Sequence, residues 1–308
     1  MELIRGLHNL RKRHHGCVAT IGNFDGVHLG HQAVIGQLAE KATELHLPTT
    51  LITFEPQPQE YFFPQASPPR LMRFREKMQA LHRYAVDRVL CLTFNDMLAQ
   101  MPHTQFIEDI LVNGLGLRYL VVGDDFRFGR EREGTFIILS EAGQKYDFQV
   151  VDMHTFSVMG ERVSSTRIRQ ALAEGNMARA EELLGRDYRM SGRVAHGAKL
   201  GRQLGFPTAN IHLHRKVSPL QGIFAVEVYG LDQEPLIGVA SLGIRPTVDG
   251  TRTLLEVYLF DFDKDIYGRH IQVSFRHKLR DEERFDSLEA LTVQIKKDVD
   301  EAREFFVN

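Results

Sequence analysis

The first half of the chain alternates short apolar runs with amphipathic stretches. Between residues 17 and 153, the apolar runs are rich in β-branched side chains and have the length of strands, and the stretches between them repeat apolar residues with roughly helical spacing. This alternation predicts a Rossmann-like α/β domain with a parallel sheet and helices on both faces. The strands are expected at 18–21, 50–54, 88–92, 119–122 and 148–151, and the helices at 31–46, 73–85, 104–113 and 134–145.

The second half has a different pattern, in which strand-like runs are separated by glycine-rich turns. This pattern predicts a small antiparallel β-barrel, with a helix at 288–306 packed across it. A chain of 308 residues is also long enough for two domains. We therefore predict an N-terminal domain over 1–186 and a C-terminal domain over 187–308. The barrel strands are expected at 188–194, 223–229, 236–240, 254–260 and 270–275.

Glycine-rich or polar segments follow three of the predicted parallel strands. Residues 22–31 follow the first strand, 55–58 the second and 123–129 the fourth. Ligands collect at the carboxyl ends of parallel strands, so these segments predict one shared site. Residues 61–70 contain three prolines and predict an irregular loop over that site.

The segment 22–31, Gly-Asn-Phe-Asp-Gly-Val-His-Leu-Gly-His, has the features of a polyphosphate site. Its glycines let the backbone approach an anion, and the first turn of the following helix points unpaired N–H groups at the same place. His28 and His31 fall on one face of that turn and can donate hydrogen bonds to oxygens that gain charge during phosphoryl transfer. A surface histidine pair after a glycine turn is the alternative.

Two further segments offer groups for the same site. Residues 164–169, Ser-Ser-Thr-Arg-Ile-Arg, stand before a helical run, where Ser164 or Ser165 can cap the helix. Such an N-terminus with two cations can also hold a triphosphate or a departing pyrophosphate. Residues 125–128, Asp-Phe-Arg-Phe, offer an acceptor, a cation and two flat surfaces for adenine or flavin. A buried phenylalanine pair beside a surface arginine is the alternative.

The second half carries a candidate site of its own. Four glycines lie between residues 192 and 205, a density that suits backbone approach to phosphates. Thr208 and Asn210 face the same side of an extended segment and offer oxygen ligands for Mg²⁺, although a turn with an Asx cap is the alternative. Glu256 begins an alternating strand and can act as a general base, unless it is an exposed residue paired with a cation such as Arg252.

These segments resemble the signatures of one family. G-x-F-D-G-x-H-x-G-H and S-S-T-x-I-R resemble the signatures of the H-x-G-H nucleotidyltransferases, and G-R-x-x-G-F-P-T-A-N-I resembles that of riboflavin kinases. Residues 243–247 and 256–262 match two further kinase segments. Nearly the whole chain is thus similar to the bacterial bifunctional riboflavin kinases/FAD synthetases. The resemblance implies that the barrel makes FMN from riboflavin and ATP, and that the N-terminal domain makes FAD and pyrophosphate from FMN and ATP.

The resemblance also implies roles for individual residues. The catalytic residues would be His28, His31 and Glu256, and Thr208 and Asn210 would bind Mg²⁺ together with ATP. In the adenylyltransferase site, ATP would contact Gly22, Phe24, Asp25, Gly26, His28, His31, Asp125, Ser164, Thr166, Arg167 and Arg169. The flavin there would contact Phe54, Pro56, Phe62, Phe126, Arg127 and Phe128. In the kinase site, ATP and flavin would contact Gly192, His196, Gly197, Gly201, Arg202, Gly205, Phe206, Pro207, Thr208, Asn210 and Arg245.

The chain departs from the family pattern at three positions. Gln57 replaces a usual histidine and so keeps hydrogen bonding but loses any positive charge, while Ser241 and Phe224 replace a frequent asparagine and tyrosine. Two other functions are alternatives: a nucleotidyltransferase for another phosphate ester with the barrel as an accessory, and a flavin-binding module without catalysis. The P-T-A-N segment argues against the first, and the joint presence of the candidate catalytic residues argues against the second.

Composition adds expectations about environment. The chain has 38 basic and 40 acidic residues, a formal net charge of -2 that gives no general attraction to nucleic acid. Cys17 and Cys91 lie far apart in apolar runs, which favours free thiols in a reducing cytoplasm. No run approaches the ~20 apolar residues of a membrane span. We expect a cytoplasmic monomer or transient oligomer whose partners are riboflavin, FMN, FAD and ATP, without nucleic acid or membrane.

Overall fold

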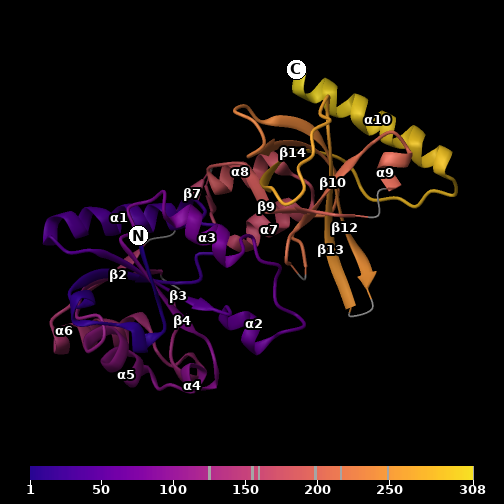
Figure 1. The fold of residues 1–308 in the computed structure, drawn as a ribbon. Helices are drawn as coiled ribbons and strands as arrows, with labels where there is room; N and C mark the ends of the chain where they lie inside the picture. Colours follow the sequence, from indigo (N-terminus) through magenta and orange to yellow (C-terminus); the bar gives the residue numbers. More distant parts are fainter. Residues whose placement is uncertain are drawn as a thin grey trace. The chain divides into compact units, whose positions relative to one another are not determined.

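Two compact units make up the chain (Figure 1). The first contains Met1–Pro68 and Phe74–Val163, and the second contains Pro69–Arg73 and Ser164–Asn308. The structure, a computed structural model, describes residues 1–123, 126–153, 156–158, 160–197, 200–215, 217–247 and 250–307.

A six-stranded parallel sheet forms the centre of the first unit, with strand order β1-β4-β3-β2-β5-β6. Each of the five predicted strands is confirmed to within two residues at either end. The sequence pattern missed β1, because its four residues carry just two apolar side chains. The strands are β1 (Glu2–Arg5), β2 (Cys17–Ile21), β3 (Thr49–Glu55), β4 (Arg88–Thr93), β5 (Leu117–Gly123) and β6 (Gln149–Met153).

Helices and short turns connect these strands. The longest, α1 (Leu29–Leu45), buries Ile35, Leu38 and Ala42 at helical spacing, and Leu38 and Ala42 pack against β2 and β5. The loop predicted over 61–70 is wrong at its start, because a helix, α2, already begins at Pro58, a residue that suits the first helical position. Other elements are three 3-10 turns (Leu7–Asn9, Lys12–His14 and Arg130–Arg132), α2 (Pro58–Phe62), α3 (Phe74–Leu81), α4 (Asp96–Ala99), α5 (His103–Gln105), a π-helical turn (Phe106–Val112), α6 (Phe136–Tyr146), β7 (Ser157–Val158) and β8 (Glu161–Arg162).

A closed antiparallel barrel forms most of the second unit, with strand order β10-β13-β12-β11-β14-β9. The predicted barrel and its closing helix, α10 (Leu288–Val307), are confirmed. Val299 and Ala302 of α10 pack against Ala225 and Phe260 of the barrel. The other elements are α7 (Ser165–Ala173), α8 (Met177–Leu184), β9 (Tyr188–Ala195), α9 (Leu200–Gln203), β10 (Thr208–His212), β11 (Gly222–Tyr229), β12 (Leu236–Thr247), β13 (Gly250–Leu259) and β14 (His270–Arg280).

A short strap, Pro69–Arg73, belongs to the second unit although it is far from the barrel in sequence. Leu71 of the strap is fully buried, and its carbonyl oxygen accepts a hydrogen bond from Tyr188 Oη at 3.0 Å. Arg215 Nη1 donates to Arg70 O at 2.6 Å. Helices α7 and α8 also group with the barrel, while the domain boundary expected at 186 stays a prediction.

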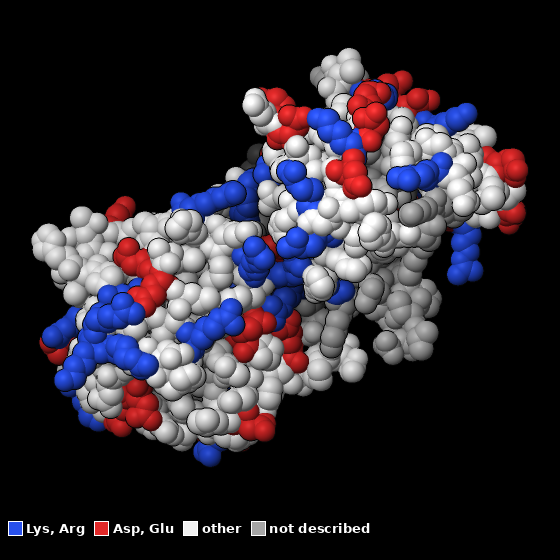
Figure 2. Space-filling model, in the orientation of Figure 1, with Lys and Arg blue, Asp and Glu red and all other residues white. Residues whose placement is uncertain are grey.

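One face of the first unit carries both basic and acidic side chains. On the face shown in Figure 2, basic and acidic side chains of this unit are interspersed, in keeping with the net charge of -2. Among the described residues, we find no helix with the length and apolar character needed to cross a membrane.

Candidate active sites

The loop from β2 to α1 holds the two candidate histidines close together. Strand β2 is buried along its whole length, and the N–H of Gly22 donates to Ile52 O at 3.0 Å, which fixes the start of the loop. The rings of His28 and His31 are stacked, with centroids 3.6 Å apart. Val27 adopts a left-handed φ of 42°, which is unusual for a β-branched residue. Strain of this kind concentrates at functional sites.

His28 also caps helix α1, a role that the sequence analysis did not foresee because histidine is not a favoured cap. The backbone N–H of His31 donates to His28 Nδ1 at 3.3 Å. An acceptor nitrogen carries no proton, so the proton of the neutral ring must lie on Nε2. Nε2–H is therefore a donor beside the positive end of the helix dipole, as the stabilisation of a developing negative charge requires.

The candidate flavin residues of the first unit divide into exposed and buried ones. Phe62 is 53% exposed, and its ring meets that of Phe94 edge to face. Phe54 and Phe128 belong to the main hydrophobic core, where Phe128 packs against Phe106. For Phe128, the geometry thus agrees with the alternative of a buried phenylalanine. Phe126 stacks on Phe128, Arg127 Nη1 donates to the Phe126 carbonyl oxygen, and Asp125 lies outside the described residues.

Other residues proposed for ATP binding are found in each unit separately. Asp25 and Gln57 are buried, and Gln57 precedes the first turn of α2. The predicted cap at Ser164 is confirmed, because the N–H of Arg167 donates to Ser164 Oγ at 3.4 Å. Arg169 Nε donates to Pro69 O of the strap at 2.7 Å. Since Ser164, Thr166, Arg167 and Arg169 belong to the second unit, their part in the ATP site stays a prediction.

The barrel contains a cavity of about 300 Å³ that brings together several predicted kinase residues. Thr208 and Glu256 both line it. Asn210 stands directly opposite Glu256 in the ladder between β10 and β13, so the two side chains lie on the same face. The lining residues are Gly201, Leu204, Phe206, Thr208, Ile223, Val239, Ser241, Glu256, Tyr258, Arg280, Glu282, Glu283, Phe285, Leu291, Ile295, Asp298 and Val299.

Two predicted glycines lie against the Thr208–Asn210 segment. A Cβ atom at Gly197 would stand 2.3 Å from Asn210 Nδ2, and one at Gly201 would stand 2.4 Å from Phe206 O. A side chain at Gly201 would therefore collide with the backbone, and one at Gly197 would displace the amide of Asn210. The other predicted kinase residues lie elsewhere in this unit. Gly192 packs against Ile211, and the ring of His196 lies tilted against that of Tyr267, with centroids 4.0 Å apart. Arg202 is on α9, Gly205 has a left-handed φ, Pro207 precedes β10, and the backbone of Arg245 is in β12.

The cavity wall contains an ion pair that was not predicted from the sequence. Arg280 of β14 donates through Nε and Nη2 to the two carboxylate oxygens of Asp298 on α10, both at 2.8 Å. The hydrogen bond with Asp298 raises the pKa of the Arg280 guanidinium above its usual value. Asp298 is buried, and Gln294 Nε2 also donates to it. The sequence signal for this pair was the charged residue Asp298 on the buried face of the amphipathic helix α10.

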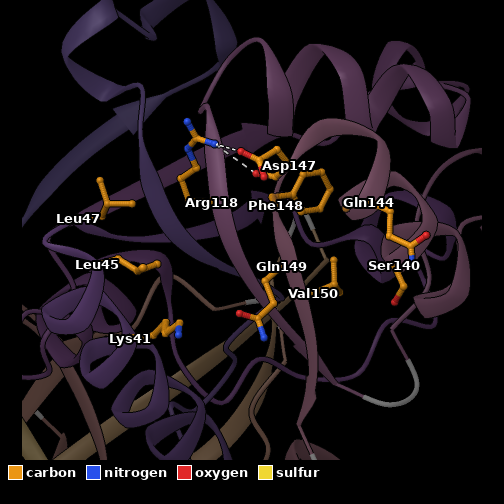
Figure 3. A pocket seen from close by; sticks show the side chains of 11 residues that line it. Lys41, Leu45, Leu47, Arg118, Ser140, Gln144, Asp147, Phe148, Gln149 and Val150 are labelled. Atoms are coloured by element: carbon orange, nitrogen blue, oxygen red, sulfur yellow. Dashed lines mark hydrogen bonds and ion pairs between the residues drawn. The ribbon is translucent and has the colours of Figure 1, made fainter.

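A larger hollow of about 740 Å³ lies at the amino ends of strands β5 and β6 of the parallel sheet (Figure 3). Arg118 and Gln149, which line it, stand at the amino ends of β5 and β6. Ligands of such sheets collect at the carboxyl ends, and none of the predicted site residues lines this hollow. Its Arg118–Asp147 ion pair, at 2.6 Å, is well exposed. We therefore do not assign it to the reaction.

Comparisons with known proteins agree with both halves of this description. A family model described as FAD synthetase matches residues 10–167, and one described as riboflavin kinase matches residues 184–306. A crystal structure from Streptococcus pneumoniae, named a macrolide-efflux protein, is 30% identical, with a TM-score of 0.85 over 98% of this chain and 99% of that one.

Curated relatives extend the similarity over the full length. The bifunctional riboflavin kinase/FMN adenylyltransferase of Escherichia coli (strain K12) is 52% identical over 307 residues, which is 99% of this chain and 98% of that one. The enzyme of the same name from Haemophilus influenzae is 50% identical over 306 residues, 99% of each chain. The chain therefore belongs to the family of bifunctional riboflavin kinases/FMN adenylyltransferases and has both enzyme activities.

Proposed function

We propose that riboflavin is phosphorylated in the barrel cavity, with Glu256 as general base. The supporting observation is that Glu256 and Thr208 line one cavity while Asn210 stands opposite Glu256. The 5′-hydroxyl oxygen of riboflavin attacks the γ-phosphorus of ATP, and its proton passes to the Glu256 carboxylate. The bond from the γ-phosphorus to the bridging oxygen breaks, and ADP leaves with that electron pair. FMN is the product.

Thr208 and Asn210 are the residues proposed to hold Mg²⁺ with ATP. A hydroxyl and an amide oxygen on one face of β10 are hard donors of the kind that Mg²⁺ prefers. The ion, when bound, offsets the phosphate charge that the hydroxyl must approach. Asn210 is buried, so its amide is held in place before substrate binds.

The loop from β2 to α1 is proposed to catalyse the second reaction. A phosphate oxygen of FMN attacks the α-phosphorus of ATP, and the bond to the β-phosphate breaks, which releases pyrophosphate. His28 Nε2–H donates to an oxygen that gains charge, and the N-terminus of α1 adds its dipole. The flavin ring is proposed to lie against the exposed Phe62.

The state of the two cysteines bears on where the enzyme is proposed to work. Both cysteines are free and buried, and burial raises the pKa of the Cys17 thiol to about 11, so this thiol is unreactive. Free thiols of this kind support the proposal that the enzyme acts on its small-molecule substrates in a reducing cytoplasm. We propose a monomer or a transient oligomer that binds neither nucleic acid nor membrane.

The base assignment is tested by Glu256→Gln, which keeps the shape of the side chain and removes its basicity. Riboflavin phosphorylation should fall about 10²–10⁴-fold. FAD formation from supplied FMN should stay at the parent rate. Glu234→Gln, at an exposed position of the same unit, is the matched control. Phosphorylation within a few-fold of the parent would remove Glu256 from the base role.

A further inference from the structure

Lys77 of α3 is a buried cation that the reactions described above do not use. Its side chain is 1% exposed, whereas lysine is almost never fully buried without a specific partner. Lys77 Nζ donates to the backbone oxygen of Asn23 at 2.9 Å and to Thr53 Oγ1 at 3.1 Å. Thr53 Oγ1 also donates to Asn23 O, at 3.4 Å.

Asn23 and Thr53 belong to elements that carry the candidate adenylyltransferase residues. Asn23 lies between Gly22 and Phe24 in the loop that leads to His28. Thr53 is on β3, one residue before Phe54. The ammonium group thus joins the β2–α1 loop (residues 22–28, called the phosphate loop below) to the end of the neighbouring strand through two charge-assisted hydrogen bonds.

The phosphate loop has a backbone that requires such support. Phe24 and Val27 have left-handed φ values of 49° and 42°. A strained conformation persists where its surroundings hold it in several ways. The hydrogen bond at Asn23 is next to the first of these residues, so its loss would release the loop where the strain begins.

We infer that Lys77 is a positioning residue for adenylyl transfer, which fixes the phosphate loop against the end of β3 so that the histidines meet the reacting phosphate in one geometry. This inference rests on the proposed function of the β2–α1 loop. A displacement of about 1 Å at a reacting centre costs about 10²-fold in rate. The effect of Lys77 is therefore expected in the turnover of this reaction.

The test uses the full chain and measures kcat and KM for both activities. Lys77→Met should lower the kcat of FAD formation from FMN about 10–10²-fold per folded molecule, with riboflavin phosphorylation within twofold of the parent. Thr53→Val removes one acceptor and leaves the ammonium on Asn23, so its kcat should fall about fivefold. Lys145→Met, at a well-exposed lysine of the same unit, is the control and should keep both activities.

The outcomes separate positioning from stability alone. If Lys77→Met does not fold, a loss of kcat in folded Thr53→Val still supports the inference, and a parent-like kcat in Thr53→Val overturns it. A folded Lys77→Met with parent kcat and just a lower melting temperature also overturns it. His28→Ala is measured in parallel: if it makes FAD normally, the site assignment itself fails, whereas an inactive His28→Ala beside a normal Lys77→Met removes the lysine alone.

Discussion

The Arg280–Asp298 pair should hold α10 against the barrel and shape the kinase cavity, and Asp298→Asn tests this. The asparagine keeps the size of the side chain but removes its charge. Both hydrogen bonds from Arg280 are 2.8 Å long, and the side chains are 17% and 4% exposed. Removing one partner of a fully buried pair costs about 3–5 kcal/mol. Because Arg280 keeps some access to water and the amide oxygen can still accept one bond, we expect about 2 kcal/mol here.

Calorimetry of the full chain measures this cost. At about 2–4 °C per kcal/mol for a unit of this size, the melting temperature of the second unit should fall by about 4–8 °C. The KM for riboflavin should rise, because both residues line the cavity. Asp300→Asn, at an exposed position on the same helix, should change neither quantity. A parent-like melting temperature together with a parent-like KM for riboflavin in Asp298→Asn would show that the ion pair neither holds α10 nor shapes the cavity.

Three other variants probe separate parts of the structure. Asn210→Ala should lower riboflavin phosphorylation at least about 10²-fold, with at most partial rescue by added Mg²⁺, and should spare FAD formation from FMN; normal Mg²⁺ dependence would contradict a metal role. Gly30→Ala places a Cβ 3.3 Å from the His28 ring, so FAD formation should slow about tenfold, whereas Gly36→Ala on the same helix meets nothing within 4 Å and should be silent. Leu71→Ala empties a fully buried position of the strap and should destabilise the second unit by about 3 kcal/mol in calorimetry; an unchanged transition would show that the strap is dispensable.

Local patterns predicted the elements but not the contacts between distant ones. The parallel strands and the barrel could be predicted because apolar periodicity is a property of neighbouring residues. Helix α2 was not predicted, because proline is typical of turns and loops, although Pro58 suits the first helical position. The hydrogen bonds of Leu71 in the strap and of Lys77 on α3 depend on partners in other elements, so no local sequence pattern predicts them.

In the candidate sites too, local patterns predicted where residues lie along the chain but not the contacts between their side chains. The position of His28 at the start of a helix follows from the glycine-rich turn, yet its stacking on His31 and its cap on α1 depend on side-chain geometry. The pairing of Asn210 with Glu256 is set by the strand register, which the sequence alone does not fix.

We propose that this one chain holds two active sites that work independently, and the variant His28→Ala tests this independence most directly. The variant is incubated with riboflavin, ATP and Mg²⁺, and the flavins are separated by chromatography. We predict that FMN forms at the parent rate and accumulates, with FAD formation reduced about 10²–10³-fold. FAD at the parent rate, or an equal loss of FMN and FAD in a folded protein, would contradict the claim.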